Sequence, residues 1–173
     1  MGIESMLMAD ARSAAQAPNL APRRRPGFHG SPVENGMATP ATHTTTHRIR
    51  FSDLDPYRHM RTAMYPAYYV DHRMEALREQ AGWDLRTLEG LPFMTFVKRI
   101  EVDFIRPVVG DQVVTIASFV RAFVGADALI DCTMTDARGA IASKCRMVVA
   151  YVDKATQRSA DWPADVRALF DER

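Results

Sequence analysis

Residues 51–69 of this chain read FSDLDPYRHMRTAMYPAYY. A strand-like segment ends here in two aspartates, Asp53 and Asp55, a polar turn follows, and Tyr65-Pro66 opens a segment of helical character. The first turn of a helix has backbone N–H groups without acceptors and carries a partial positive charge. The pattern therefore predicts a carboxylate beside a helix N-terminus. A carboxylate next to donors that hold a carbonyl oxygen is suited to acyl transfer.

Regular structure is expected on both sides of this stretch. We predict a strand over 45–51 and a helix over 65–81 that ends at Gly82. Strand-like runs separated by short turn sequences then follow at 93–106, 112–123, 127–136 and 140–152, and a short helix is expected at 163–170. Links of hairpin length predict an antiparallel sheet. One helix cannot cover both faces of such a sheet, so we expect a second copy of the chain to bury one face and an edge.

The composition is that of a globular protein with a different N-terminal segment. The chain has 173 residues, 47% of them hydrophobic and 25% charged, with a net charge of +1. This balance predicts no nucleic-acid partner, and no apolar run is long enough to predict a membrane span. Residues 1–43 are rich in Ala, Pro, Gly, Ser and Arg and are predicted to be a disordered tail. A translation start at Met37 is a further hypothesis for this segment.

The two cysteines, Cys132 and Cys145, lie in apolar strand-like runs. Buried, inert thiols in a reducing compartment are the expectation for such residues. We therefore predict a cytoplasmic protein without a disulfide framework.

The stretch 51–65 resembles the hotdog-fold acyl-CoA thioesterases of the 4-hydroxybenzoyl-CoA thioesterase type. Their pattern is approximately Asp-x-Asp-x-x-Gly-His-Val-Asn-Asn-Ala-x-Tyr, followed by a helix. Residues 102–111, VDFIRPVVGD, are similar to that family's strand and turn before the central hairpin. The resemblance covers about 45–153. It implies an α+β hotdog fold, with a long central helix wrapped by a five-stranded antiparallel sheet, in a domain spanning 44–173.

The resemblance also implies how such a protein works. It implies homodimers or homotetramers with active sites at the subunit interface. The substrate would be the thioester of an acyl-CoA or of an acyl carrier protein, and neither a metal nor a redox cofactor would be needed. Two other functions stay open, namely a hotdog-fold hydratase or dehydratase, and a non-catalytic acyl-CoA-binding dimer.

Residue roles follow from the same resemblance. Asp55 takes the position of the catalytic aspartate, either as the nucleophile or as the general base toward water, and the backbone N–H of Tyr65 takes that of the oxyanion donor. His59 matches the family's histidine, with a positioning role or a role in proton transfer. A plainer interpretation of Asp55 is that it only caps the loop. For Asp53 we expect hydrogen bonding within the loop.

The loop departs from the family pattern at three positions. Arg58 replaces the usual glycine, and Arg61-Thr62 replace the asparagine pair. Glycine adopts a positive φ easily whereas arginine does not, so the loop is expected to run differently here. Arg61 is expected to bring a cation near the site.

Other polar residues have simpler interpretations. Asp71, His72 and Arg73 lie along the predicted helix. They either line the acyl pocket or the dimer interface, or form solvated or interfacial ion pairs. His43 and His47 would lie roughly 13 Å apart on a strand, so they are not expected to share a metal ion.

Overall fold

The computed structural model describes residues 41–171 of the chain. The predicted tail therefore lies outside the described residues, apart from its last three positions. The elements in chain order are β1 (His43–Arg48), η1 (Phe51–Asp53), α1 (Met64–Ala81), α2 (Leu85–Gly90), β2 (Phe93–Phe104), β3 (Val113–Val124), β4 (Asp127–Thr135), β5 (Ile141–Asp153), β6 (Arg158–Ser159), α3 (Ala164–Arg167) and η2 (Ala168–Phe170).

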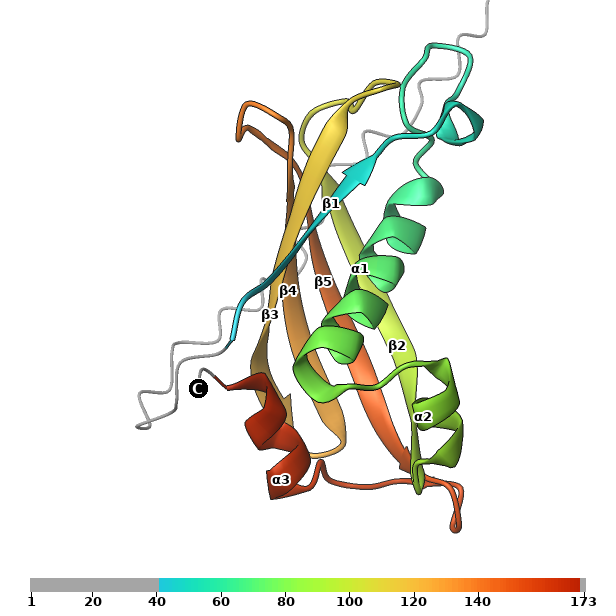
Figure 1. The fold of residues 1–173 in the computed structure, drawn as a ribbon, viewed down its shortest axis with the longest axis vertical. Helices are drawn as coiled ribbons and strands as arrows, with labels where there is room; N and C mark the ends of the chain where they lie inside the picture. Colours follow the sequence, from blue (N-terminus) through green and yellow to red (C-terminus); the bar gives the residue numbers. More distant parts are fainter. Residues whose placement is uncertain (1–40, 172–173) are drawn as a thin grey trace, which may run out of the picture. The chain divides into compact units, whose positions relative to one another are not determined.

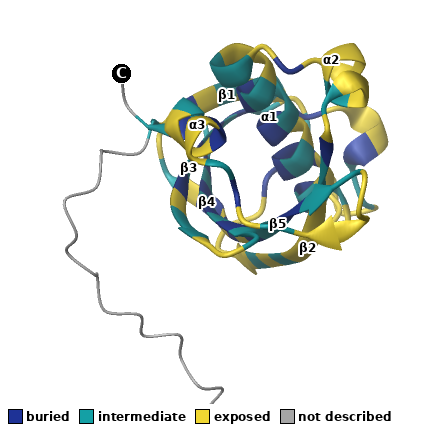
Figure 2. Cartoon of the chain, turned by 90° about the horizontal axis from the view of Figure 1, so that it is seen from below, coloured by how far each residue is buried: buried dark blue, intermediate teal, exposed yellow. Residues whose placement is uncertain are grey.

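One antiparallel sheet forms the body of the fold. Its strand order is β1-β3-β4-β5-β2, and the short β6 pairs with β5 (Figure 1). The register shifts at 97–99 in β2 and at 120–122 in β3, and such irregularities bend and twist a strand. The sheet accordingly curls, and α1 lies against its concave side (Figure 2). The predicted α+β architecture, a long helix wrapped by an antiparallel sheet, is confirmed.

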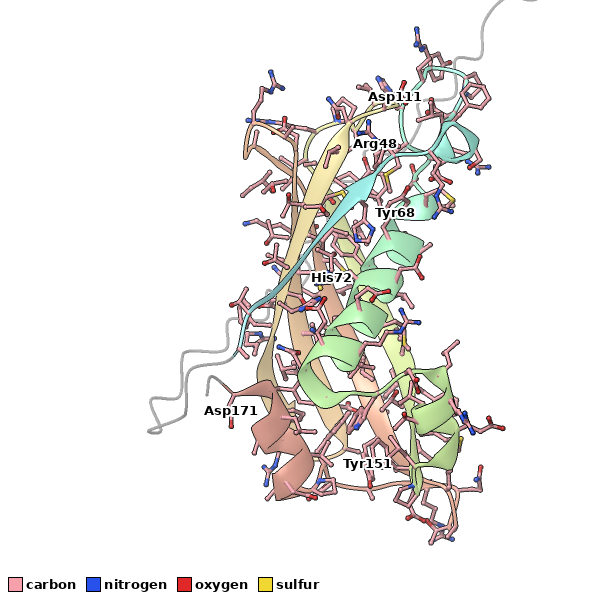
Figure 3. All side chains as sticks on the ribbon, viewed as in Figure 1. Arg48, Tyr68, His72, Asp111, Tyr151 and Asp171 are labelled. Atoms are coloured by element: carbon pink, nitrogen blue, oxygen red, sulfur yellow. The ribbon has the colours of Figure 1, made fainter. Side chains whose placement is uncertain are left out.

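The core occupies the space between α1 and the concave face of the sheet. Strand β4 shows the alternation that one buried face requires, because every second residue from Ala128 to Met134 is buried. Helix α1 contributes Tyr65, Tyr69 and Ala76, each almost fully buried. Aromatic packing closes the end of the fold at which Tyr151 lies (Figure 3), because the Tyr151 ring stacks on Phe93 and adjoins other aromatic rings, among them Trp162.

Three details differ from the sequence predictions. Residues 51–53 form a turn of 3₁₀ helix, so β1 ends at Arg48 and the strand does not run into the aspartates. Helix α1 begins at Met64, which places Pro66 third in the helix, where its missing N–H removes no helical hydrogen bond. Helix α2 was not predicted, although the Asp84 carboxylate caps it by accepting from the Thr87 N–H at 2.7 Å.

Within the described part of the chain, no helix is both long and apolar enough to cross a membrane.

Candidate active site

Asp53 ties the loop after β1 to the helix that follows it. The side chain is 5% exposed, and its Oδ2 accepts a 2.6 Å hydrogen bond from the Tyr68 hydroxyl. Its backbone carbonyl accepts from the N–H of Arg61 at 2.8 Å. Burial is the larger cause, and the contact with Asp53 the smaller, of a rise in the pKa of Tyr68 to about 12. The phenol therefore remains a donor at neutral pH. Asp53 thus has the loop hydrogen-bonding role expected from the sequence.

Asp55 organises the tight turn that carries His59. Its Oδ1 accepts hydrogen bonds of 2.9 Å from the backbone N–H groups of Tyr57 and His59. Its backbone N–H donates to the carbonyl of His59 at 2.8 Å. Its Oδ2 receives no hydrogen bond from residues 41–171. One carboxylate oxygen is therefore used for the loop, while the other is available to a ligand.

His59 is held through its backbone. Besides its two bonds to Asp55, it forms an isolated antiparallel bridge with Val109, in the connection between β2 and β3. The neighbouring Met60 N–H donates to the carbonyl of Val108 at 2.7 Å. The imidazole itself is half-buried. The loop is thus pinned to a second loop by main-chain contacts, independent of most of its side chains.

Arg58 adopts a backbone conformation that glycine reaches more easily than any other residue. Its φ is +63°, in the left-handed region, and its N–H donates to the carbonyl of Asp55 at 3.0 Å. The surrounding main-chain bonds hold Arg58 in this conformation, while the expectation that the loop runs differently from the family's stays a prediction. The cost of this conformation for a residue with a Cβ is about 1–2 kcal/mol. Arg61 lies over the loop, with its guanidinium donating to the carbonyl of Ser52 at 2.6 Å.

The first turn of α1 has an uncapped end. The N-cap residue Ala63 offers no side-chain acceptor, and the Met64 N–H donates to the carbonyl of Arg61 at 2.8 Å. Among the described residues nothing accepts from the N–H of Tyr65, and Pro66 has none to donate. The Tyr65 ring is buried against Phe104, with the ring centres 5.0 Å apart. The side chain of Tyr65 therefore anchors the helix start, and its N–H is free at the positive end of the helix dipole.

A polar groove opens beside this helix start. It has a volume of ≈ 500 Å³ and is lined by residues of β1, by η1 and by α1, including His47, Asp53 and Tyr68. Arg48 and Asp111 are also in its lining, and the Arg48 guanidinium donates to the carbonyl of Asp111 at 3.3 Å (Figure 3). Asp55 does not line this groove. The structure therefore separates the two aspartates, with Asp53 facing the groove and Asp55 in the adjoining turn.

A buried hydrogen-bonded chain crosses from the middle of α1 to the groove. The His72 ring contacts the Thr45 hydroxyl through Nδ1 at 2.7 Å and the Ser118 hydroxyl through Nε2 at 2.8 Å. Arg73 donates to the same Ser118 oxygen at 2.9 Å, and Thr45 reaches Nε2 of His47 at 2.7 Å. The chain thus links β1, α1 and β3 (Figure 3 labels His72).

The donor and acceptor properties of these groups determine the direction of each hydrogen bond. Arg73 can only donate, so Ser118 accepts from it and has its own hydrogen for His72. Burial lowers the pKa of His72 to about 3, which keeps the ring neutral. A neutral ring that accepts at Nε2 carries its proton at Nδ1 and donates it to Thr45, which in turn donates to His47. The sequence prediction of solvated or interfacial ion pairs for His72 and Arg73 is wrong, because both side chains are buried inside the protein.

The comparisons with known proteins identify the family and the fold. The family model of the thioesterase-like superfamily matches residues 49–170. The chain belongs to the thioesterase-like superfamily. No curated protein matches it. The match begins directly after β1 and includes the loop, the helix start and strands β2 to β6, so Asp55, His59 and Tyr65 all lie inside the matched part.

Solved structures share the fold at low sequence identity. The hypothetical protein SAV2348 from Staphylococcus aureus, solved in complex with CoA, aligns with a TM-score of 0.69 and 18% identity over 78% of this chain and 85% of its own. The YbaW probable thioesterase from Escherichia coli aligns with a TM-score of 0.66 and 19% identity, over 75% of this chain and 99% of its own. A thioesterase from Thermus thermophilus, complexed with coenzyme A and Zn, aligns with a TM-score of 0.63 and 22% identity, over 73% of this chain and 90% of its own. These likenesses establish the hotdog fold.

Proposed function

We propose that this protein is an acyl-CoA thioesterase of the 4-hydroxybenzoyl-CoA thioesterase type, with Asp55 as its catalytic carboxylate. The observation that carries the proposal is that two groups, a carboxylate oxygen in the loop and an N–H at the start of α1, have no hydrogen-bond partner among residues 41–171. Asp55 is fixed through one oxygen and leaves the other available, and the helix that the loop enters has a free N–H at Tyr65. Membership of the thioesterase-like superfamily supports the same reaction.

The reaction would use these groups as follows. The thioester carbonyl oxygen accepts from the Tyr65 N–H, where the helix dipole stabilises the negative charge that develops in the transition state. Oδ2 of Asp55 then either attacks the carbonyl carbon, or takes a proton from a water molecule that attacks it. The first route expels the CoA thiolate and leaves a mixed anhydride that water hydrolyses. Both routes yield the free acid and CoA, and His59 serves to position Asp55.

A thiol-release screen tests the proposal. Short, long and aromatic acyl-CoAs are offered to the wild type and to Asp55→Asn, with Asp165→Asn as a control because Asp165 is an exposed carboxylate on α3. We expect turnover of at least one thioester, a loss of about 100-fold or more in Asp55→Asn, and no change in the control. Tight acyl-CoA binding without thiol release would instead favour a non-catalytic binding protein. Hydration of an enoyl-CoA would favour a hydratase.

We further infer that the working unit is a homodimer or a larger oligomer joined along β2. This strand is at the edge of the sheet, is 12 residues long and has half-exposed apolar side chains, with Phe96 50% and Phe104 52% exposed. Long apolar edge strands are sites of pairing with another chain. Light scattering after gel filtration is expected to give at least twice the 19.4 kDa chain mass, and Phe96→Lys is expected to lower it. A wild-type monomer at micromolar concentration would contradict this.

A cytoplasmic location belongs to the same proposal. Cys132 and Cys145 are directly opposite each other on β4 and β5, and both are free thiols. Neighbouring free thiols are typical of a reducing compartment.

A further inference from the structure

An apolar cavity lies between the middle of α1 and the concave face of the sheet. Its volume is ≈ 90 Å³, several times the space that one water molecule needs. The lining comes from α1, four strands and the C-terminal segment, and it includes Met74, Phe123, Met147 and Trp162. Arg73 is its single charged residue. The cavity therefore combines a large hydrocarbon surface with one cation.

Arg73 is a buried cation without a counter-ion in the described chain. The side chain is 8% exposed, and its guanidinium donates to Ser118 at 2.9 Å. No carboxylate of residues 41–171 lies within ion-pair distance of it. A guanidinium has five N–H donors, and a buried charge is destabilising unless an anion and further acceptors accompany it. An anion in the cavity would supply the partner that residues 41–171 do not.

Cys132 is paired on the neighbouring strand with Ser118, which accepts from Arg73, and an ionised Cys132 would oppose the lowering of the pKa of Arg73 by burial. A hydrogen bond from Cys145, and the charge of Arg73, lower the pKa of Cys132, while its burial opposes this. A thiolate formed there would compete with an external anion for the guanidinium. Replacing Cys132 therefore shows whether the partner of the Arg73 guanidinium is the Cys132 thiolate or an external anion.

We propose that this cavity binds a hydrophobic carboxylate, with the carboxylate on the Arg73 guanidinium and the hydrocarbon body against the apolar lining. The planar guanidinium matches a carboxylate in a two-point contact, which an alcohol cannot reproduce. Each buried methylene strengthens binding about fourfold. The ligand is either a free acid or the far end of an acyl group that carries a terminal carboxylate. The second source rests on the proposed function, and Arg73 lies about 12 Å along α1 from Tyr65, at 1.5 Å per residue.

Binding is measured on the full chain by titration with hexanoate and with hexan-1-ol, followed through the fluorescence of Trp162 in the cavity wall and by calorimetry. We expect the wild type to bind hexanoate at least about 10-fold more tightly than hexan-1-ol. In Arg73→Met this preference should be lost, while in Arg146→Met, an exposed cation on β5, it should remain. Equal affinity for acid and alcohol, no binding of either, or an unchanged preference in Arg73→Met would overturn the proposal.

Two further variants keep the result interpretable. Arg73→Met is expected to unfold at the same or a higher temperature than the wild type, because it removes an unpaired buried charge. If it does not fold, Arg73→Lys tests the same preference with the charge kept and the two-point contact removed, and should bind hexanoate more weakly. Cys132→Ser should bind hexanoate within about twofold of the wild type. Binding 10-fold tighter in Cys132→Ser would identify the thiolate as the anion and overturn the proposal.

The source of the carboxylate is decided by turnover of adipyl-CoA and hexanoyl-CoA, which have equal chain lengths. A preference for adipyl-CoA that Arg73→Met reverses assigns the cavity to the acyl group of the substrate. Inhibition of hexanoyl-CoA turnover by hexanoate, without a preference for adipyl-CoA, assigns it to a free acid. If neither thioester nor any other acyl-CoA is hydrolysed while hexanoate still binds selectively, the proposed function fails and the cavity proposal stands.

Discussion

The first turn of α1 and its middle turns hold polar groups in place by different means. In the loop that leads into the first turn, Asp55 and His59 are held by contacts with main-chain N–H and C=O groups, so a residue as unsuited as Arg58 still adopts the turn. Around the middle turns the contacts of His72 and Arg73 run through side-chain hydroxyls inside the protein. We infer that the loop tolerates substitutions at most positions, whereas the interior site tolerates few of those that leave a buried charge or acceptor without its partner.

The largest expected effect contrasts side chain with backbone at the helix start. Tyr65→Phe keeps the N–H and the buried ring, so thioester turnover should stay within about threefold of the wild type, whereas Asp55→Asn should lose about 100-fold. Steady-state kcat/KM on the best acyl-CoA from the screen measures both. A loss in Tyr65→Phe comparable to that in Asp55→Asn would mean that the phenol of Tyr65, and not its N–H, donates to the thioester carbonyl oxygen.

A second test removes the hydroxyl shared by His72 and Arg73. Ser118→Ala leaves a buried acceptor and a buried charged donor without their partner, and the free energy of unfolding should fall by about 2–3 kcal/mol. Ser52→Ala is the matched control, because Ser52 is exposed and its hydroxyl is 3.3 Å from Asp53; it should change stability by less than about 0.5 kcal/mol. Urea denaturation of both variants gives the two values, and equal losses would erase the contrast between the sites.

A third test uses pH. The pKa of His72 is lowered from 6.5 to about 3 in the folded protein, so below pH 6.5 the unfolded chain binds a proton that the folded protein does not. The free energy of unfolding therefore holds the full contribution of neutral His72 above pH 6.5. It loses that contribution as the pH falls, by about 2 kcal/mol at pH 5. The free energy of unfolding measured between pH 7 and pH 5 should fall less steeply in His72→Gln. Identical slopes in the two proteins would assign the pH dependence to other groups.

The smallest effect is expected at the strained position of the loop. Arg58→Gly relieves a positive φ of 63° but gives the unfolded chain more freedom, so the net stabilisation should be about 0.5–1 kcal/mol. Arg61→Gly is the comparison, because Arg61 donates to the carbonyl of Ser52 and has no positive φ to relieve. The shift in melting temperature checks this, and a destabilised Arg58→Gly would mean that the arginine side chain makes contacts that outweigh the strain.

Much of the frame was predictable from local pattern. The long helix and the four long strands were placed to within one or two residues, because hydrophobic periodicity and turn residues act over a few positions. The loop was predicted less well, since the predicted strand 45–51 ran to the residue at which a turn of 3₁₀ helix begins. Its 3₁₀ turn depends on Asp53, which is fixed by the Tyr68 hydroxyl fifteen residues later. A contact of that kind leaves no periodic signal.

By itself the sequence determined the order of the elements and the pairing of an aspartate-bearing loop with a helix start, since both follow from near-neighbour preferences. Only the tertiary structure decided what happens in the interior of α1. There the curl of the sheet brings Ser118 against His72 and Arg73 and closes an apolar cavity over the guanidinium. The physical reason is that burial and charge pairing depend on which distant strands pack against the helix. The sequence near Arg73 contains no local signal that identifies those strands.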